Sequence, residues 1–263
     1  MSNNHNTLCI ITGASRGLGK FITAHFAEHF PSTHFILIAR NGNELNDSKN
    51  SITQIDANAS VDIYSVDLGD LNNLKTNVDK VFEKIDTSKY KQSFLINNAG
   101  SVGPLVYLSE IDDLSAIKQA VDFNVTSFIW LSVRFLKAFR NLSTSVFVVN
   151  LSSLAAVKPF QSWGVYCAGK AARDMLTAVI AEETENTKAT IKSLNYAPGP
   201  CDTDMQKDVR ELCGHQSTRE TFAQMKAKGT LVDPSESSLV LVKLLKSNEF
   251  QSGAHIDYFD VKK

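Results

Sequence analysis

The sequence predicts an α/β fold in which a doubly wound parallel sheet lies between two layers of helices. Short apolar segments alternate along the chain with longer segments whose apolar residues recur at helical spacing. This alternation is typical of parallel sheets covered by helices. A glycine-rich turn directly follows the first apolar segment. Such a turn at the first strand-to-helix junction is typical of Rossmann-type folds.

The length and composition of the chain favour a single domain over residues 1–263, because we find no linker, internal repeat or low-complexity stretch. A net charge of −1 argues against nucleic acid or a membrane surface as the main partner. No apolar run approaches the roughly 18 residues of a membrane span, and we see no secretion signal. The four cysteines lack metal-binding spacing. We therefore expect a cytoplasmic protein with reduced thiols and no metal.

The first predicted strand, residues 7–11, runs into the turn Thr12-Gly13-Ala14-Ser15-Arg16-Gly17-Leu18-Gly19. Apolar residues between 21 and 30 then recur at helical spacing. In this strand–turn–helix context the glycines indicate a dinucleotide site. Small residues let the backbone approach a pyrophosphate, and the helix N-terminus favours its negative charge.

The second predicted strand, residues 34–39, ends at Arg40 and Asn41. Folds that select NAD usually carry an acidic residue here for the ribose 2′-hydroxyl, whereas an arginine accommodates the 2′-phosphate of NADP. Arg16, inside the glycine turn, can reach the same phosphate from the other side. The alternative is that both arginines are solvated surface side chains. Two basic residues without an acid at the strand end favour NADP.

The middle of the chain continues the alternation, with helices expected over 44–57 and 70–85 and strands over 61–66 and 93–96. Asp67 and Leu68 follow the third strand, and Asn97-Asn98-Ala99-Gly100 follows the fourth. Small and amide side chains at the carboxyl end of a strand suit contact with a cofactor ring. The alternative for the second group is a simple turn.

The second half is expected to form helices over 111–120, 121–139, 164–183 and 235–245, and strands over 146–151, 191–196 and 255–259. Pro198-Gly199-Pro200 ends the sixth strand and opens a polar segment, residues 201–229. A segment of this length between sheet elements is usually a lid or substrate loop. We expect it to contain helices of its own.

Ser153, Tyr166 and Lys170 carry the expected chemistry. The fifth strand leads to Ser153, and Tyr166 and Lys170 share one helix face because they are four residues apart. The serine could orient a carbonyl and the phenol could move a proton. The lysine charge would lower the phenol pKa from its usual value of about 10. This arrangement suits carbonyl reduction; the alternative is a core tyrosine beside a solvated lysine.

Four motifs, in this order and spacing, resemble those of the short-chain dehydrogenase/reductase family: Thr12-Gly13-x-x-x-Gly17-x-Gly19, Asn97-Asn98-Ala99-Gly100, Ser153 with Tyr166-x-x-x-Lys170, and Pro198-Gly199. The resemblance covers essentially the whole chain. It implies that Tyr166 protonates a carbonyl oxygen oriented by Ser153. It also implies that Lys170 binds the nicotinamide ribose and lowers the tyrosine pKa, and that Asn124 continues a proton relay through water. Members of the family form dimers through the two long helices, here near 121–139 and 164–183.

The motifs and the resemblance together give these expected NADPH-binding residues: Gly13, Ala14, Ser15, Arg16, Gly17, Leu18, Gly19, Arg40, Asn41, Asp67, Leu68, Asn97, Ala99, Gly100, Tyr166, Lys170, Cys201, Asp202, Thr203, Asp204, Met205 and Gln206. The expected substrate-binding residues are Ser153, Leu154, Tyr166, Gly199 and Asp257. The expected catalytic residues are Ser153, Tyr166, Lys170 and Asn124.

Several segments resemble the members of that family that reduce carbonyls on a pterin side chain in tetrahydrobiopterin synthesis: residues 162–176, 194–205, 226–229 and 250–257. In those enzymes the aspartate matching Asp257 anchors the pterin ring. A carboxylate suits this role because it can accept hydrogen bonds from both the 2-amino group and the ring N–H. The alternative is an exposed charge at a strand end. Residues 101–113 look less familiar and could reshape the pocket rim.

Two other functions remain open. One is a reductase of the same family with another carbonyl substrate, such as an aromatic ketone or a diketone. The other is a non-enzymatic NADPH-sensing protein on the same fold. The intact Ser153, Tyr166 and Lys170 argue against the second function, because a binding protein needs no proton donor.

Overall fold

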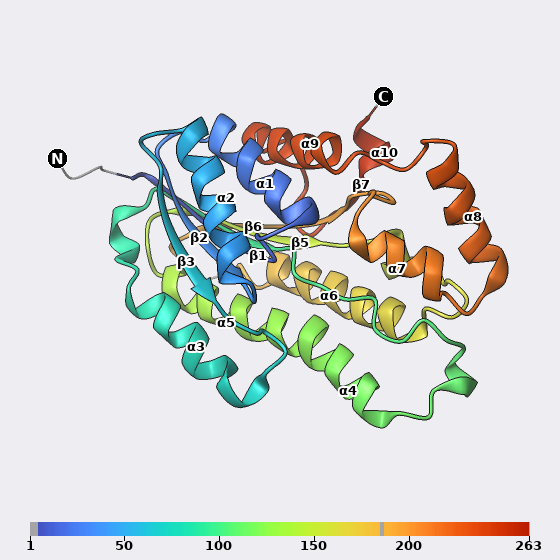
Figure 1. Ribbon diagram of the computed structural model, residues 1–263. Helices are drawn as coiled ribbons and strands as arrows, with labels where there is room; N and C mark the ends of the chain where they lie inside the picture. Colours follow the sequence, from blue (N-terminus) through green and yellow to red (C-terminus); the bar gives the residue numbers. More distant parts are fainter. Residues whose placement is uncertain (1–4, 185–186, 263) are drawn as a thin grey trace.

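The computed structural model describes residues 5–184 and 187–262. Its centre is a seven-stranded parallel sheet in the order β3-β2-β1-β4-β5-β6-β7 (Figure 1). The strands are β1 (Thr7–Thr12), β2 (Thr33–Ala39), β3 (Ser60–Ser65), β4 (Gln92–Asn97), β5 (Ser145–Leu151), β6 (Thr190–Ala197) and β7 (His255–Asp257). The predicted doubly wound α/β fold is confirmed. The strand order reverses between β1 and β4, the point where such sheets bind ligands at their carboxyl ends.

Helices cover both faces of this sheet (Figure 1). One face carries α1 (Gly17–His29), α2 (Gly42–Ile55) and α9 (Pro234–Ser247). The other carries α3 (Leu71–Glu83), α4 (Leu114–Val121), α5 (Ser127–Phe139) and α6 (Gly164–Glu182). The three expected layers are therefore present, and α5 and α6 correspond to the two long helices expected near 121–139 and 164–183.

The central strands are continuously apolar because both of their faces are buried. In β1, Cys9 and Ile11 pack in one apolar core with residues of α1 and α9. Leu8 and Ile10 pack in a second core with residues of α3 and α5. Successive side chains of a strand point to opposite faces, so one short strand serves both cores.

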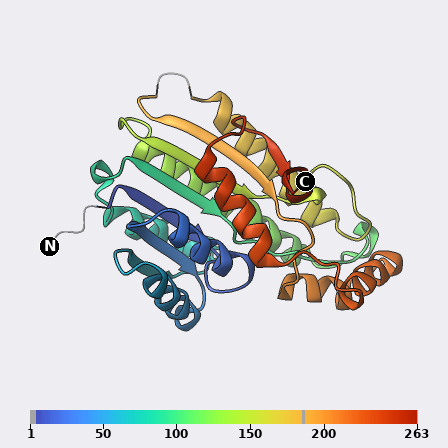
Figure 2. The same cartoon turned by 90° about the horizontal axis from the view of Figure 1, so that it is seen from above.

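Residues 201–229 contain two helices, as the sequence predicts: α7 (Asp204–Leu212) and α8 (Gln216–Ala227). A bridge pairs Cys201 with Val232 where the chain leaves β6. At the far end of α7 the buried Cys213 thiol accepts a hydrogen bond from the Trp163 indole, 3.4 Å away. This segment lies at one end of the molecule, beyond the sheet (Figure 2).

Three elements differ from the expected ones. The helix expected over 111–120 begins only at Leu114, where the Asp113 carboxylate caps it, after a 3₁₀ turn at Leu108–Glu110. The helix expected over 121–139 is interrupted by a π-helical turn, Asp122–Thr126. The strand expected over 255–259 stops at Asp257, because this carboxylate caps a short helix, α10 (Tyr258–Val261).

Within residues 5–184 and 187–262, no helix combines the length and the apolar composition needed to cross a bilayer. The same residues contain no cluster of three or more histidine, cysteine or acidic side chains that could hold a metal ion. The four cysteines are free thiols, and Cys9, Cys201 and Cys213 are buried.

Candidate active site

The turn between β1 and α1 brings backbone atoms into close contact. Gly13 has a φ of 65°, and a Cβ there would lie 2.8 Å from Asn98 Nδ2. A Cβ on Gly19 would lie 2.1 Å from the Gly13 carbonyl oxygen. Arg16 precedes α1 without a capping side-chain hydrogen bond, and the first turn of the helix has no acidic residue. The N-terminal amides of α1 can therefore serve an anion such as a pyrophosphate.

The two expected phosphate-binding arginines lie at the ends of neighbouring strands. Arg40 follows β2 and is exposed, and its carbonyl oxygen accepts a hydrogen bond from the Ser65 hydroxyl. Arg16 forms an ion pair with Asp204 at the start of α7, and both side chains are more than 60% exposed. An exposed pair adds little stability, so a phosphate could compete with Asp204 for Arg16. Asn41 caps α2 through the Glu44 amide.

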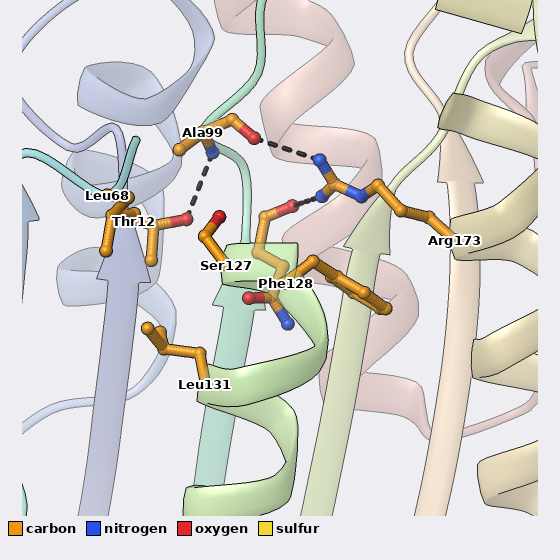
Figure 3. A pocket seen from close by; sticks show the side chains of 8 residues that line it. Thr12, Leu68, Ala99, Ser127, Phe128, Leu131 and Arg173 are labelled. Carbon is orange, nitrogen blue, oxygen red and sulfur yellow. Dashed lines mark hydrogen bonds between the residues drawn. The ribbon is translucent and has the colours of Figure 1, made fainter. Parts of the chain in front are cut away.

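The loop after β4 is tied to the glycine turn. Asn98 Nδ2 donates to the carbonyl oxygens of Thr12 and Gly13, both at 3.0 Å. The Ala99 amide donates to the Thr12 hydroxyl at 3.0 Å, and Figure 3 shows the Ala99 carbonyl on its other side, bound by the Arg173 guanidinium at 2.9 Å. Nearby, Leu68 is buried after β3. Two structural elements therefore fix the loop that is expected to meet the cofactor ring.

Ser153, Tyr166 and Lys170 are brought together at the carboxyl end of β5. Ser153 follows the strand and accepts a hydrogen bond from the Ala155 amide at 3.1 Å. Tyr166 and Lys170 lie on α6 and are only 7% and 6% exposed. Lys170 Nζ donates to the Leu151 carbonyl oxygen at 2.5 Å and lies 5.6 Å from the Tyr166 ring centroid. The spacing in the sequence therefore corresponds to one compact group of side chains.

Burial controls the protonation of this group. It raises the pKa of Tyr166 to about 12, although hydrogen bonding to Ser153 and the charge of Arg173 act in the opposite direction. The pKa of Lys170 lies well below its usual value, because burial and the Arg173 charge disfavour the ammonium. The pKa of Tyr166 is thus raised rather than lowered, and Lys170 is not among the groups that lower it. A phenol that keeps its proton is suited to donate one.

Asn124 lies in the π-helical turn before α5. Its Oδ1 accepts a hydrogen bond from the Ser101 amide and its Nδ2 donates to the Ser101 carbonyl oxygen, both at 2.9 Å. The side chain is thus paired on both sides with the loop that follows Gly100. Its side-chain amide therefore ties the π turn to the loop at Ser101.

Of the expected residues from 201 to 206, Thr203 and Asp204 lie beside the glycine turn. The Thr203 methyl carbon would be 3.6 Å from a Cβ on Gly17. Asp202 forms ion pairs with Lys226 and Arg210, which tie the start of α7 to α8. Met205 packs in a small apolar cluster with Trp163 and Tyr166, while Gln206 is buried.

Asp257 and Gly199 lie at the carboxyl ends of the last two strands. Asp257 is paired in register with Ala197, two residues before Gly199. Its Oδ1 accepts a hydrogen bond from the Phe259 amide at 3.0 Å, while its own amide donates to Asp260 at 3.1 Å. The carboxylate thus caps the start of α10. Leu154, which follows Ser153, is 45% exposed.

The sequence model of the short chain dehydrogenase family matches residues 7–213. The chain belongs to the short-chain dehydrogenase/reductase family. It is therefore an oxidoreductase. A sepiapterin reductase from Rattus norvegicus is 37% identical over 257 residues, which cover 97% of each chain. A benzil reductase from Bacillus cereus is 32% identical over 247 residues, which cover 93% of this chain and 96% of that one.

Solved structures with bound dinucleotides have the same fold. A short chain dehydrogenase from Shigella flexneri complexed with NADP has a TM-score of 0.75, with 20% identity over 96% of this chain and 97% of that one. NAD⁺-bound xylitol dehydrogenase has a TM-score of 0.77, with 21% identity over 97% of this chain and 98% of that one. One structure holds NADP and the other NAD⁺, so the fold alone does not select the cofactor.

Besides Asn97, which the sequence analysis predicted, the structure of this short-chain dehydrogenase/reductase contains polar residues that the sequence analysis missed. Asn97, Asn150, Asn195 and His255 are neighbours in register across β4, β5, β6 and β7, and we call them the polar row. Arg173 and Asp174 of α6 lie against this row. Arg173 Nε donates a hydrogen bond to Asn150 Oδ1 at 2.7 Å, and Asp174 Oδ2 is hydrogen-bonded to His255 Nδ1 at 2.6 Å. A sequence signal existed, because each asparagine stands at or near the end of an apolar strand.

Proposed function

We propose that this chain is an NADPH-dependent sepiapterin reductase, which reduces carbonyls on the side chain of a pterin in tetrahydrobiopterin biosynthesis. The observation that carries the proposal is the identity of 37% to a sepiapterin reductase over nearly the full length of both chains. Asp257, the residue expected to recognise the pterin ring, lies beside Ala197 at the carboxyl end of β7. Ser153 follows the carboxyl end of β5, two strands away in the same parallel sheet.

The residues around the first strand fit a dinucleotide. Side chains at Gly13 and Gly19 would collide with neighbouring atoms, and the N-terminus of α1 has no capping side chain. The N-terminal amides of α1 would hold the pyrophosphate, and Lys170 would hold the nicotinamide ribose. A bound reduced nicotinamide supplies the hydride of the reaction. Arg40 and Arg16 would meet the 2′-phosphate, which favours NADPH over NADH.

The chain's own side chains supply the proton and hold the carbonyl. Tyr166 donates its phenolic proton to the carbonyl oxygen as that oxygen gains negative charge. Ser153 donates a hydrogen bond to the same oxygen and orients it. The raised pKa of Tyr166, about 12, keeps the phenol protonated at neutral pH before reaction. Trp163 packs edge-on against the Tyr166 ring, with centroids 5.7 Å apart, and limits its movement.

A second candidate function is the reduction of an aromatic diketone. The identity of 32% to a benzil reductase favours it, because the two relatives cover the chain almost equally. Both functions use Ser153, Tyr166 and Lys170 in the same roles. The two functions differ in their need for Asp257, because benzil has no N–H groups that could donate hydrogen bonds to a carboxylate.

We also propose a homodimer through α5 and α6. Their outer surfaces expose Ile129, Met175 and Val179, which are 37%, 66% and 39% exposed. Apolar side chains gathered on neighbouring helices favour burial against another protein surface. Light scattering coupled to size-exclusion chromatography should give twice the mass of one chain. Replacement of Met175 and Val179 by glutamate should shift the protein toward the monomer.

The proposed activity is tested by single-turnover reduction of sepiapterin and of benzil with a stoichiometric amount of NADPH. We expect NADPH to be oxidised with sepiapterin and a pterin alcohol to be recovered. The catalytic efficiency for sepiapterin should exceed that for benzil. A protein that reduces benzil but leaves sepiapterin unchanged would establish the second function instead. A protein that binds NADPH and reduces neither would favour the sensing role.

A further inference from the structure

Asp174 connects three elements that carry different parts of the candidate site. Its Oδ1 accepts hydrogen bonds from the Ser152 hydroxyl at 2.5 Å and from Asn150 Nδ2 at 2.9 Å. Its Oδ2 lies 2.6 Å from His255 Nδ1. Asp174 belongs to α6, the helix of Tyr166, and Ser152 directly precedes Ser153. One carboxylate therefore holds the helix of the proton donor, the strand of the orienting serine and the last strand of the sheet.

The last strand depends on such side-chain contacts. β7 contains three residues, forms the edge of the sheet and is paired only with β6 among the described strands. A short edge strand has few backbone hydrogen bonds to fix its position. His255 and Asp257 are two residues apart, so their side chains leave the strand on the same face. A contact that holds His255 therefore also holds the backbone of this three-residue strand, from which Asp257 extends.

The contact between Asp174 and His255 is partly shielded from water. The Asp174 side chain is 13% exposed and the His255 side chain 23%. Hydrogen bonds between charged groups are shorter and stronger than neutral ones, and partial burial strengthens them further. This contact is therefore suited to hold β7 against α6, whereas a fully exposed ion pair would contribute little.

The same helix also holds the opposite end of the polar row. Arg173, which is 1% exposed, donates to the carbonyl oxygens of Asn97 at 2.6 Å and Ala99 at 2.9 Å. These oxygens belong to the loop expected to meet the cofactor ring (Figure 3). Adjacent residues of α6 thus fix the loop after β4 through Arg173 and the end of β7 through Asp174. The distance between these two sites is set by one rigid helix.

We propose that Asp174 and His255 position Asp257 relative to Tyr166 and so determine specificity for the pterin, without contacting the carbonyl that reacts. The inference rests on the proposed function, because it concerns how the pterin-recognising carboxylate is held. Substrates that lack a pterin ring do not use Asp257 and should not depend on the contact.

The contact should make pterin binding depend on pH. The charged groups that face His255 are Asp174 from α6, Asp257 from β7 and Asp260 from α10, all acidic. They raise the pKa of His255 above its usual value, with the Asp174 hydrogen bond as the largest cause. Below this pKa the contact is an ion pair. As pH rises through it, the imidazole becomes neutral, the contact weakens and the KM for a pterin should increase.

Two substitutions of His255 separate the effect of its hydrogen bond from the effect of its charge. His255→Leu removes the hydrogen bond, whereas His255→Asn places an amide nitrogen near the position of Nδ1 and keeps a neutral donor. His29→Asn, at the end of α1, is the matched control. KM and kcat are measured for sepiapterin and for benzil across neutral pH, with NADPH saturating.

We expect His255→Leu to raise the KM for sepiapterin about tenfold, as the loss of a charge-assisted hydrogen bond predicts. The benzil parameters should stay within about twofold of wild type, a change too small to indicate a lost hydrogen bond. His255→Asn should restore most of the sepiapterin affinity, and its KM should no longer rise with pH. His29→Asn should keep the wild-type pH profile.

Parallel losses on both substrates, or no change on either, would overturn the inference. If His255→Leu does not fold, the pH profile of His255→Asn decides: a KM that still rises with pH as in wild type contradicts the assignment. Wild-type activity on sepiapterin together with unaffected variants would remove this inference and leave the proposed function intact. A wild-type protein inactive on sepiapterin would remove both.

Discussion

The Lys170 side-chain nitrogen donates a hydrogen bond to the carbonyl oxygen of Leu151 at a distance of 2.5 Å, although the sequence spacing pairs the lysine with Tyr166. This hydrogen bond fixes the lysine to the end of β5, and its nitrogen remains 5.6 Å from the Tyr166 ring centroid. Both side chains are buried, so each disfavours its charged form. The raised pKa of Tyr166 therefore favours a protonated phenol, which suits the proposed role of a general acid.

Replacement of Tyr166 by phenylalanine removes the proposed proton donor. General acid catalysis contributes about 10²–10⁴-fold, so kcat for carbonyl reduction should fall by at least this order. Binding of NADPH, measured by fluorescence, should change little because the ring remains. Tyr64→Phe on β3 serves as the control. A Tyr166 variant that keeps most of its activity would show that another group supplies the proton.

The raised pKa of Tyr166 also predicts its titration. The phenol should stay protonated up to about pH 10, where an ordinary tyrosine is half ionised. The tyrosinate absorbance of wild type minus that of Tyr166→Phe should therefore be near zero over this range in the absence of NADPH. A difference signal that grows between neutral pH and about pH 9 would contradict the dominance of burial.

Arg40 should determine the preference between the two nicotinamide cofactors. Arg40→Asp places a carboxylate where a 2′-phosphate is expected, so repulsion should raise the KM for NADPH, and the preference over NADH should narrow. Arg140→Asp, directly after α5, makes the same charge change away from the glycine turn. Equal use of NADPH and NADH by the unmodified protein would contradict the assignment.

Gly19 should tolerate no side chain, because a Cβ there would lie 2.1 Å from the Gly13 carbonyl oxygen. Such overpacking typically costs about 1–3 kcal/mol of stability, because the backbone must move to make room for the added carbon. Gly19→Ala should therefore lower the free energy of unfolding and weaken NADPH binding. Gly42→Ala is the control, since its Cβ would meet Ser65 at an ordinary 3.7 Å. Normal NADPH affinity in Gly19→Ala would show that the turn does not approach the cofactor.

The fold was predictable from the sequence because each strand and most helices are marked by a pattern of neighbouring residues. Buried strands such as β1 have an uninterrupted apolar centre, and α6 and α9 follow recognisable helical spacing. The interruptions were harder to predict. The π turn at Asn124 lies in a segment whose apolar pattern continues without a break, and α10 begins because Asp257 happens to cap it.

The site was predictable only where its residues form motifs along the chain. Ser153, Tyr166 and Lys170 are close in sequence, and the structure brings them together. The contact between Asp174 and His255 joins residues that are 81 positions apart, and only the packing of α6 against the sheet brings them side by side. The pKa of Tyr166 depends on how deeply the ring is buried, which charge spacing in a sequence does not report.

Asp257 offers the sharpest separation between recognition of a pterin and maintenance of the fold. Asparagine is as good a helix cap as aspartate, so Asp257→Asn should keep α10 while removing the charge and one acceptor. Asp260→Ala is the matched control, because it removes the partner of the Asp257 amide but leaves the Asp257 carboxylate in place.

The most direct measurement is therefore the catalytic efficiency of Asp257→Asn for sepiapterin and for benzil, in the same preparation and with NADPH saturating. A lost charge-assisted hydrogen bond predicts a decrease of roughly tenfold to a hundredfold for sepiapterin. Benzil reduction should stay near the wild-type rate, and Asp260→Ala should affect neither substrate selectively. Equal losses on both substrates, or an undiminished efficiency for sepiapterin, would contradict the account that this reductase recognises a pterin through Asp257.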